Sequence, residues 1–393
     1  MRYRSIMMLA GVMTFTACNE SATSNGSPTA PSMSAKMPAG TTQVIDGSTG
    51  PGSLYRMVRP ANWNGSLLIY AHGYISPDQP IALPAEAGLI VGLLAPQGFA
   101  VAYSSFSENG WDVKDGAQRT HQLLGLFTSN FGKPSNTYIA GASMGGLIAI
   151  KLAETYPKEY VGTLAACAVA AGTGPLFDYH ANVRALFDVL YPGVLPGSAG
   201  YLPPGTDVNS QIVGPALVAM ATNPAYVPYF AAIAQTAVPG ATGPQLVEAI
   251  VTALVGNAGE LSETLLTNGK PYFDNTHTVY SSAFLPPSIM QSVNSAIGRF
   301  SASPAALAAL RQNYLPTGDI HTPMLMLSGN FDPVVPGFNQ ASYAAAASAA
   351  GTSDLLVQRF VNANGHCGFT PQDLGKAFGD LVLWAQFGIK PTP

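Results

Sequence analysis

The chain has 393 residues, enough for one large domain or two ordinary ones, and its 47% hydrophobic content is ample for a substantial core. Only 10% of the residues are charged, and the formal net charge is -4. This composition excludes a disordered chain and, because no basic run is present to neutralise phosphates, argues against a nucleic-acid partner.

The N-terminus has the pattern of an export signal. Arg2 and Arg4 precede an apolar stretch, residues 6–15, that is too short to span a bilayer. Because Phe15-Thr16-Ala17-Cys18 resembles a bacterial lipobox, residues 1–18 are predicted to be a signal peptide with lipid attachment at Cys18; simple secretion is the alternative. We therefore expect a cell-envelope lipoprotein held at a membrane surface, or otherwise a periplasmic or extracellular protein.

Residues 19–40 are rich in Ser, Thr, Ala and Pro and almost lack large apolar side chains. Such a segment has nothing to bury, so it is predicted to be a flexible tether.

Apolar runs alternate with helical patterns over residues 41–170. The predicted strands cover residues 54–58, 67–71, 98–103, 138–140 and 161–168, and the predicted helices cover residues 83–94, 113–127 and 144–156. This βαβ rhythm is typical of a parallel sheet flanked by helices.

The rhythm stops between residues 171 and 317, where Pro and Gly clusters separate short helical patterns. These patterns cover residues 216–221, 229–237, 245–255 and 304–313. Strands are predicted again at residues 324–328 and 355–360, with helices at 341–350 and 374–387. Residues 171–317 are therefore predicted to be a mostly helical cap inserted into a core of residues 41–170 and 318–393, over the sheet edge where ligands of α/β proteins bind. A separately folded second domain is the alternative.

Gly141-Ala142-Ser143-Met144-Gly145 matches the G-x-S-x-G nucleophile elbow and lies between a predicted strand and a predicted helix. The sharp turn of an elbow strains the backbone of the serine, so small residues are required two positions before and after it. Gly141 and Gly145 meet this requirement, which makes Ser143 the predicted nucleophile.

A serine nucleophile needs a base and a group that orients the base. Asp332 and His366 each follow one of the last two predicted strands, and the chain order Ser143, Asp332, His366 is the one associated with α/β-hydrolases. Asp178 and Asp354 are the alternative acids.

These motifs resemble those of secreted bacterial α/β-hydrolases of the serine esterase and lipase type, over about residues 50–390. The resemblance is carried by the elbow, by His72-Gly73-Tyr74, by the loop at residues 329–336 and by Gly365-His366. It implies an α/β-hydrolase fold with a mostly parallel central sheet flanked by helices and a helical cap inserted after the strand that follows the elbow. It also implies an oxyanion hole formed by the amides of Tyr74 and Met144, with His72 supporting the loop.

Two cysteines remain after Cys18. Cys167 ends the strand beside the elbow and Cys367 follows His366, so a disulfide between them would hold the histidine loop above the sheet. Two buried thiols are the alternative. No spacing of metal ligands, phosphate loop or dinucleotide fingerprint is present, so neither a metal nor a cofactor is expected.

The expected reaction is acyl transfer from a small-molecule ester. Because the predicted cap is apolar and has few charges, uncharged hydrophobic or aromatic esters are the expected substrates. Tyr179, His180 and Arg184 are candidate polar contacts to the substrate; ordinary packing within the cap is the alternative.

Three other functions are compatible with this pattern. A proline-type exopeptidase of the same fold needs cap carboxylates to bind a free amine, and the predicted cap offers Asp188, Glu248, Glu260 and Glu263 among others. A polyester depolymerase fits export but not a cap that would block a polymer. A binding protein that has lost catalysis is disfavoured because its triad would usually be broken.

Overall fold

The computed structural model describes residues 40–50, 52–263 and 270–393. The predicted signal peptide, the lipidation residue Cys18 and the tether up to residue 39 lie outside the described residues. Within the described part, no helix is both long and apolar enough to cross a bilayer.

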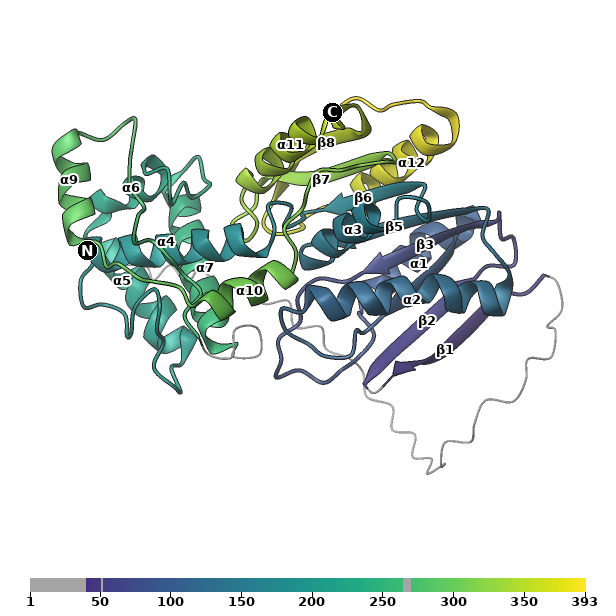
Figure 1. Cartoon of the computed structure of the whole chain (residues 1–393), viewed down its shortest axis with the longest axis horizontal. Coiled ribbons are helices and arrows are strands. Elements are labelled where there is room, and N and C mark those ends of the chain that lie inside the picture. The colour runs from purple at the N-terminus through teal and green to yellow at the C-terminus, as the bar shows by residue number, and fades with distance from the viewer. Residues whose placement is uncertain (1–39, 51, 264–269) are drawn as a thin grey trace, which may run out of the picture. The chain divides into compact units, whose positions relative to one another are not determined.

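One eight-stranded sheet forms the centre of the chain, in the order β1-β2-β4-β3-β5-β6-β7-β8 (Figure 1). The strands are β1 (Gln43–Gly50), β2 (Ser53–Arg59), β3 (Ser66–Ala71), β4 (Ala100–Ser104), β5 (Asn136–Ala142), β6 (Gly162–Ala166), β7 (Met324–Phe331) and β8 (Leu356–Asn364). β2 runs antiparallel to both of its neighbours, and the pairings among β3 to β8 are all parallel. This order and direction define an α/β-hydrolase fold, so the predicted fold class is confirmed.

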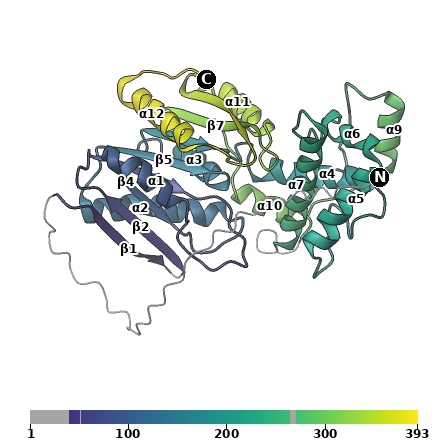
Figure 2. The ribbon, with the colours of Figure 1, turned by 180° about the vertical axis from the view of Figure 1, so that it is seen from behind.

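Helices cover both faces of the sheet (Figures 1 and 2). The α-helices that the structure describes are α1 (Ala87–Leu94), α2 (Val113–Phe131), α3 (Met144–Thr155), α4 (Thr173–Leu190), α5 (Gly214–Thr222), α6 (Val227–Ala232), α7 (Gly243–Ser262), α9 (Pro287–Ala296), α10 (Pro304–Gln312), α11 (Phe338–Ala350) and α12 (Pro371–Phe387). Leu68 of β3 packs with α1 and α12, whereas Leu67 and Ile69 pack with α2 and α3. Successive side chains of a strand point to opposite faces, which is why a continuous apolar run fits this doubly covered sheet.

Helices α4 to α10 lie between β6 and β7 in the chain and group together beside the sheet (Figures 1 and 2). They form the inserted helical region that the sequence predicts, but α7 is longer than expected and α4 is an additional long helix. α4 has 18 residues and α7 has 20. α4 was not predicted, because its start at Gly172-Thr173-Gly174-Pro175 has the composition of a loop and Gly172 has a φ of 94°.

The structure also differs from the predicted strands at two places. β1 was not predicted, because its residues are all half-buried or exposed and lack an apolar run. β7 continues to Phe331, so the first part of the predicted acid loop belongs to the strand. Asp332 is thus the first residue after β7, which places its carboxyl directly at the end of the sheet.

A disulfide joins Cys167, the first residue after β6, to Cys367 in the loop after β8. The two Cα atoms are 5.4 Å apart although 200 residues separate the cysteines in sequence. The amide of Cys167 also donates to the carbonyl of Leu327 in β7, at 2.8 Å. The bond therefore closes a loop that contains all the inserted helices, β7 and β8.

Replacing both cysteines by serine should lower the free energy of unfolding by about 2–4 kcal/mol, because the unfolded chain then regains the freedom that a closed long loop removes. Urea unfolding with and without a reductant measures this change. The reductant should destabilise the wild-type protein and leave the double variant unchanged; equal midpoints for the oxidised and reduced wild type would contradict the stabilising role.

Candidate active site

The elbow places Ser143 directly after β5 with backbone angles of φ 57° and ψ -123°. A side chain at Gly141 would overlap the carbonyl oxygen of Gly145. One at Gly145 would overlap the carbonyl oxygens of Ala71 and His72. These close approaches are the physical reason for both glycines, and they hold the serine in a conformation that a non-glycine residue rarely adopts.

Asp332 and His366 are hydrogen-bonded, with Nδ1 of the imidazole 2.8 Å from Oδ2 of the carboxylate. The other carboxylate oxygen accepts from the amides of Val334 and Val335, at 2.9 Å each. An ionised carboxylate only accepts hydrogen bonds, so Nδ1 carries the proton of this pair. Nε2 of His366 is then the nitrogen available to act as a base.

Ser143 and His366 line the same cavity, which has a volume of about 560 Å³. No hydrogen bond joins their side chains in the described part of the chain. Catalytic hydrogen bonds often tighten only when the substrate is bound, so a shared cavity is the relevant arrangement. Three strand ends, those of β5, β7 and β8, bring Ser143, Asp332 and His366 to one edge of the sheet.

The two amides predicted to form the oxyanion hole also border this site. A side chain at Gly73 would stand 3.3 Å from Cβ of Ser143, so the loop carrying Tyr74 runs directly beside the serine. Met144 is the first residue of α3, where backbone amides carry partial positive charge. Neither amide donates in any turn, loop or cap hydrogen bond of the described chain, which leaves both available to an oxyanion.

His72 holds the loop before Tyr74 in place. Its Nδ1 lies 2.7 Å from the carbonyl oxygen of Gly73, and its ring stacks on Phe106 with 3.7 Å between centroids. Burial lowers the pKa of His72, so its imidazole is neutral near pH 7. It therefore acts as a positioning residue rather than as a charged one.

The insertion forms the opposite wall of the cavity through α4. Leu176, Phe177 and His180 lie on one face of this helix and line the cavity together with Trp111. Trp111 contacts the rings of Phe177 and Tyr74, with centroid separations of 5.3 and 6.3 Å. This aromatic wall was not predicted. Trp111 follows a predicted strand and could have been selected, but Phe177 lies on a helix that the sequence did not reveal.

Hydrogen bonds tie the loop before α2 to the inserted helices. The indole of Trp111 donates to Thr173 Oγ1 at 2.9 Å, and its amide donates to the carboxylate of Glu263. The amide of Val113 donates to Asn313 Oδ1 at 3.1 Å. The aromatic wall is therefore anchored from both sides of the cavity.

Besides Glu86, two carboxylates from the inserted region line the cavity, although few charges were expected there. Glu260 is bonded to His180 Nδ1 and to the Tyr272 hydroxyl, both at 2.6 Å. Burial raises the pKa of Glu260, and the contact with His180 opposes this shift. Burial also raises the pKa of Glu263, and the bond from the Trp111 amide opposes it. Both carboxylates thus already have partners within the protein.

Of the three candidate substrate contacts, only His180 lines the cavity. Tyr179 is buried against Phe338, with 5.4 Å between ring centroids. Arg184 is fully buried one helical turn beyond His180, where it pairs with Asp188 at 2.9 Å. Arg184 therefore packs within the insertion, whereas Tyr179 packs between the insertion and α11 of the core; neither side chain faces the cavity.

One group of metal-ligating residue types occurs near the site in the described chain: Cys167, His366 and Cys367. The two sulfur atoms are bonded to each other, so no thiolate is available to a metal ion. The arrangement instead fixes the loop that carries the imidazole.

Comparison with family models matches residues 95–184 to an esterase family described as "Putative esterase". The matched segment runs from β4 through the elbow into α4 and includes Ser143. No curated protein matches the chain. Residues 95–184 thus carry the sequence pattern of an esterase family.

Several solved structures are similar in shape at low sequence identity. Feruloyl esterase B from Aspergillus oryzae has 14% identity and a TM-score of 0.48, covering 89% of this chain and 82% of its own. An esterase from Pyrococcus furiosus has 13% identity and a TM-score of 0.44, covering 87% and 90%. Proline iminopeptidase from Mycobacterium smegmatis has 13% identity and a TM-score of 0.41, covering 88% and 97%.

Replacing Gly145 by alanine should destabilise the protein by about 3 kcal/mol or more, because the new methyl group would force two backbone carbonyls apart. Gly125→Ala in α2 is the matched control, since a methyl group there meets only open space and should be neutral or stabilising. Urea unfolding of both variants tests the close approach at the elbow. Equal stabilities of the two variants would contradict it.

Proposed function

We propose that the chain is a serine carboxylic-ester hydrolase in which Ser143, His366 and Asp332 form the catalytic triad. The observation that carries this proposal is the Asp332–His366 hydrogen bond at the edge of the cavity that also contains the strained Ser143. The esterase pattern of residues 95–184 supports the same reaction class.

The acylation step follows from these positions. Oγ of Ser143 attacks the ester carbonyl while Nε2 of His366 takes its proton, and Asp332 stabilises the imidazolium that forms. The amides of Tyr74 and Met144 receive the negative charge of the tetrahedral intermediate; removing one such donor typically lowers kcat by about 10²–10³-fold. His366 then gives its proton to the leaving alcohol oxygen as the carbon–oxygen bond breaks.

Deacylation repeats the sequence with water. His366 takes a proton from the water molecule that attacks the acyl carbonyl, and the same amides hold the second oxyanion. Collapse of this intermediate returns the proton to Ser143 and releases the carboxylic acid. The products are one alcohol and one acid for each ester and water consumed.

The proposed substrates are uncharged hydrophobic or aromatic esters. Trp111, Phe177 and Leu176 offer an apolar and aromatic wall opposite the serine. Glu260 and Glu263 lie in the same cavity and would repel substrates that carry a free carboxylate. Neutral esters fit both features.

A proline-type exopeptidase is the second candidate, because Glu260 and Glu263 lie where a free amine could be bound. The existing bonds of both carboxylates count against it, since an incoming ammonium group would compete with His180, Tyr272 and the Trp111 amide. Of the other two candidate carboxylates for binding an amine, Asp188 is paired with Arg184, and neither it nor Glu248 lines the cavity.

We also propose that the protein is exported and lipid-anchored at Cys18. The charged and apolar pattern of residues 1–18 supports export. The Cys167–Cys367 disulfide is consistent with an oxidising compartment outside the cytosol.

Ser143→Ala should lower kcat/KM at least about 10³-fold on every ester that the wild type hydrolyses, because no other group can form the acyl-enzyme. The assay is a panel of p-nitrophenyl esters of graded acyl length, with aminoacyl-p-nitroanilides alongside. Ser129→Ala, on the exposed side of α2, is the matched control and should behave like wild type. Undiminished ester hydrolysis by Ser143→Ala would refute the elbow assignment, and faster cleavage of anilides than of esters would favour the exopeptidase.

Asp332→Asn should lower kcat by roughly 10⁴-fold without unfolding the protein, because an amide in this place favours the wrong tautomer of His366. Asp354→Asn is the control, because it makes the same chemical change in the turn before β8, the strand that leads to His366. Steady-state kinetics together with circular dichroism measure the two effects. A decrease of kcat by less than tenfold in Asp332→Asn would mean that another carboxylate orients His366.

A further inference from the structure

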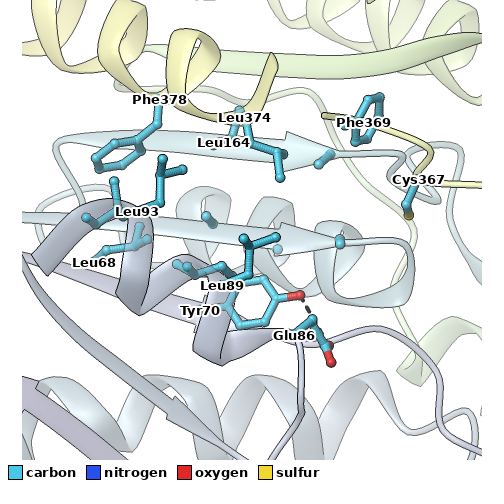
Figure 3. Close-up of a pocket in the computed structure, with 16 residues that line it drawn as sticks. Leu68, Tyr70, Glu86, Leu89, Leu93, Leu164, Cys367, Phe369, Leu374 and Phe378 are labelled. Atoms are coloured by element: carbon cyan, nitrogen blue, oxygen red, sulfur yellow. Dashed lines mark hydrogen bonds between the residues drawn. The ribbon is translucent and has the colours of Figure 1, made fainter. Parts of the chain in front are cut away.

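A second cavity lies between the sheet and the helices α1 and α12 (Figure 3). Its volume is about 230 Å³. Side chains from three parallel strands and both helices line it, among them Leu68, Leu93, Leu164, Leu374 and Phe378. None of its lining residues belongs to α4 or to the aromatic wall of Trp111 and Phe177.

The two cavities share part of their lining. Tyr70, Glu86, Ala142 and Cys367 border both. Ala142 directly precedes Ser143, and Cys367 directly follows His366. The second cavity therefore begins beside the residues proposed to carry out the reaction.

Its lining is suited to a hydrocarbon chain. Apart from Tyr70 and Glu86, the side chains drawn in Figure 3 offer no charged or hydroxyl group. Burial raises the pKa of Tyr70, so its hydroxyl is neutral, and Glu86 is exposed at the margin. A charged or strongly polar group would lose its hydrogen bonds to water there and gain no partner, which costs free energy. An alkyl group would be transferred from water to an apolar surface, which is favourable.

The boundary between the cavities is held weakly. The hydroxyl of Tyr70 donates to Oε1 of Glu86 at 3.4 Å, well beyond the usual length of an O–H···O hydrogen bond (Figure 3). Glu86 precedes α1 as its N-cap residue and makes no capping bond through its side chain. Moving the Glu86 side chain away from the boundary between the cavities would therefore break only this long hydrogen bond.

We propose that this cavity binds the alkyl chain of the alcohol part of the ester, an inference that rests on the proposed function. The alcohol oxygen must lie next to Nε2 of His366 to receive its proton, and the residues that follow the histidine, Cys367 and Phe369, line the cavity. The acyl part then faces the aromatic wall of Trp111 and Phe177. Substrates are accordingly esters of long, unbranched apolar alcohols.

The test compares two ester series. One series holds acetate constant and lengthens the alcohol from ethyl to octyl; the other holds the methyl group constant and lengthens the acid. In the alcohol series, kcat/KM should rise up to about fourfold per methylene until the cavity is filled.

Two variants change the cavity in opposite directions. Leu89→Trp, on α1, should reduce the octyl-to-ethyl ratio of kcat/KM by about tenfold, because the larger side chain shortens the cavity. Leu93→Ala should move the optimum to a longer alcohol. Leu383→Trp is the matched control: this leucine is also partly exposed, at 43% against 50% for Leu89, and it lines neither cavity.

A binding measurement separates this inference from the proposed function. Calorimetry of 1-octanol with Ser143→Ala, with and without Leu89→Trp, requires no turnover. Binding that depends on Leu89 supports the alkyl site even if no ester is hydrolysed, in which case the proposed function alone fails. Octanol binding and alcohol-series slopes that are both unaffected by Leu89→Trp and Leu93→Ala overturn the alkyl site. A response confined to the acid series overturns the assignment to the alcohol.

Discussion

The close approach of three backbone segments at the elbow is the constraint on which the rest of the site depends. Gly145 lies against the carbonyl oxygens of Ala71 and His72, and Gly141 lies against that of Gly145. The end of β3, the end of β5 and the start of α3 can meet only because these positions have no side chain. The same contact presents Ser143 above the sheet and brings the loop of Gly73 beside it. The same packing therefore positions both Ser143 and the loop that carries Tyr74.

The parallel sheet then gathers residues that are distant in sequence. Ser143, Asp332 and His366 follow β5, β7 and β8, whose carboxyl ends share one edge. Cys167 and Cys367 stand at the same edge, with φ values of 42° and 53°, in the region that non-glycine residues rarely occupy. Their disulfide and the Asp332–His366 bond restrain the histidine loop from two directions. Such strained positions persist only where the surrounding structure holds them, and Cys367 lines the cavity beside His366.

The sequence predicts those parts of the fold that depend on local pattern. The elbow, the parallel strands and the order of Ser143, Asp332 and His366 all have local signals, and the fold class built on them is confirmed. The shape of the inserted region has no such signal. Its helix α4 begins with glycines and a proline, and whether a side chain such as Arg184 faces the cavity depends on where that helix packs. Cavity walls made by distant segments, such as Trp111 with Phe177, follow only from tertiary structure.

The two cavities divide the surroundings of Ser143 by chemistry. On the side of α4, the wall is aromatic and contains two carboxylates whose hydrogen bonds are satisfied within the protein. On the side of α1 and α12, the wall is almost entirely hydrocarbon. In the proposed arrangement, each of the two substituents of an ester fills its own cavity, and burial of apolar surface distinguishes them without any charged contact. The proposed role of His366 adds direction to this choice, since the substituent that leaves with a proton from the imidazole must be the one nearest to it.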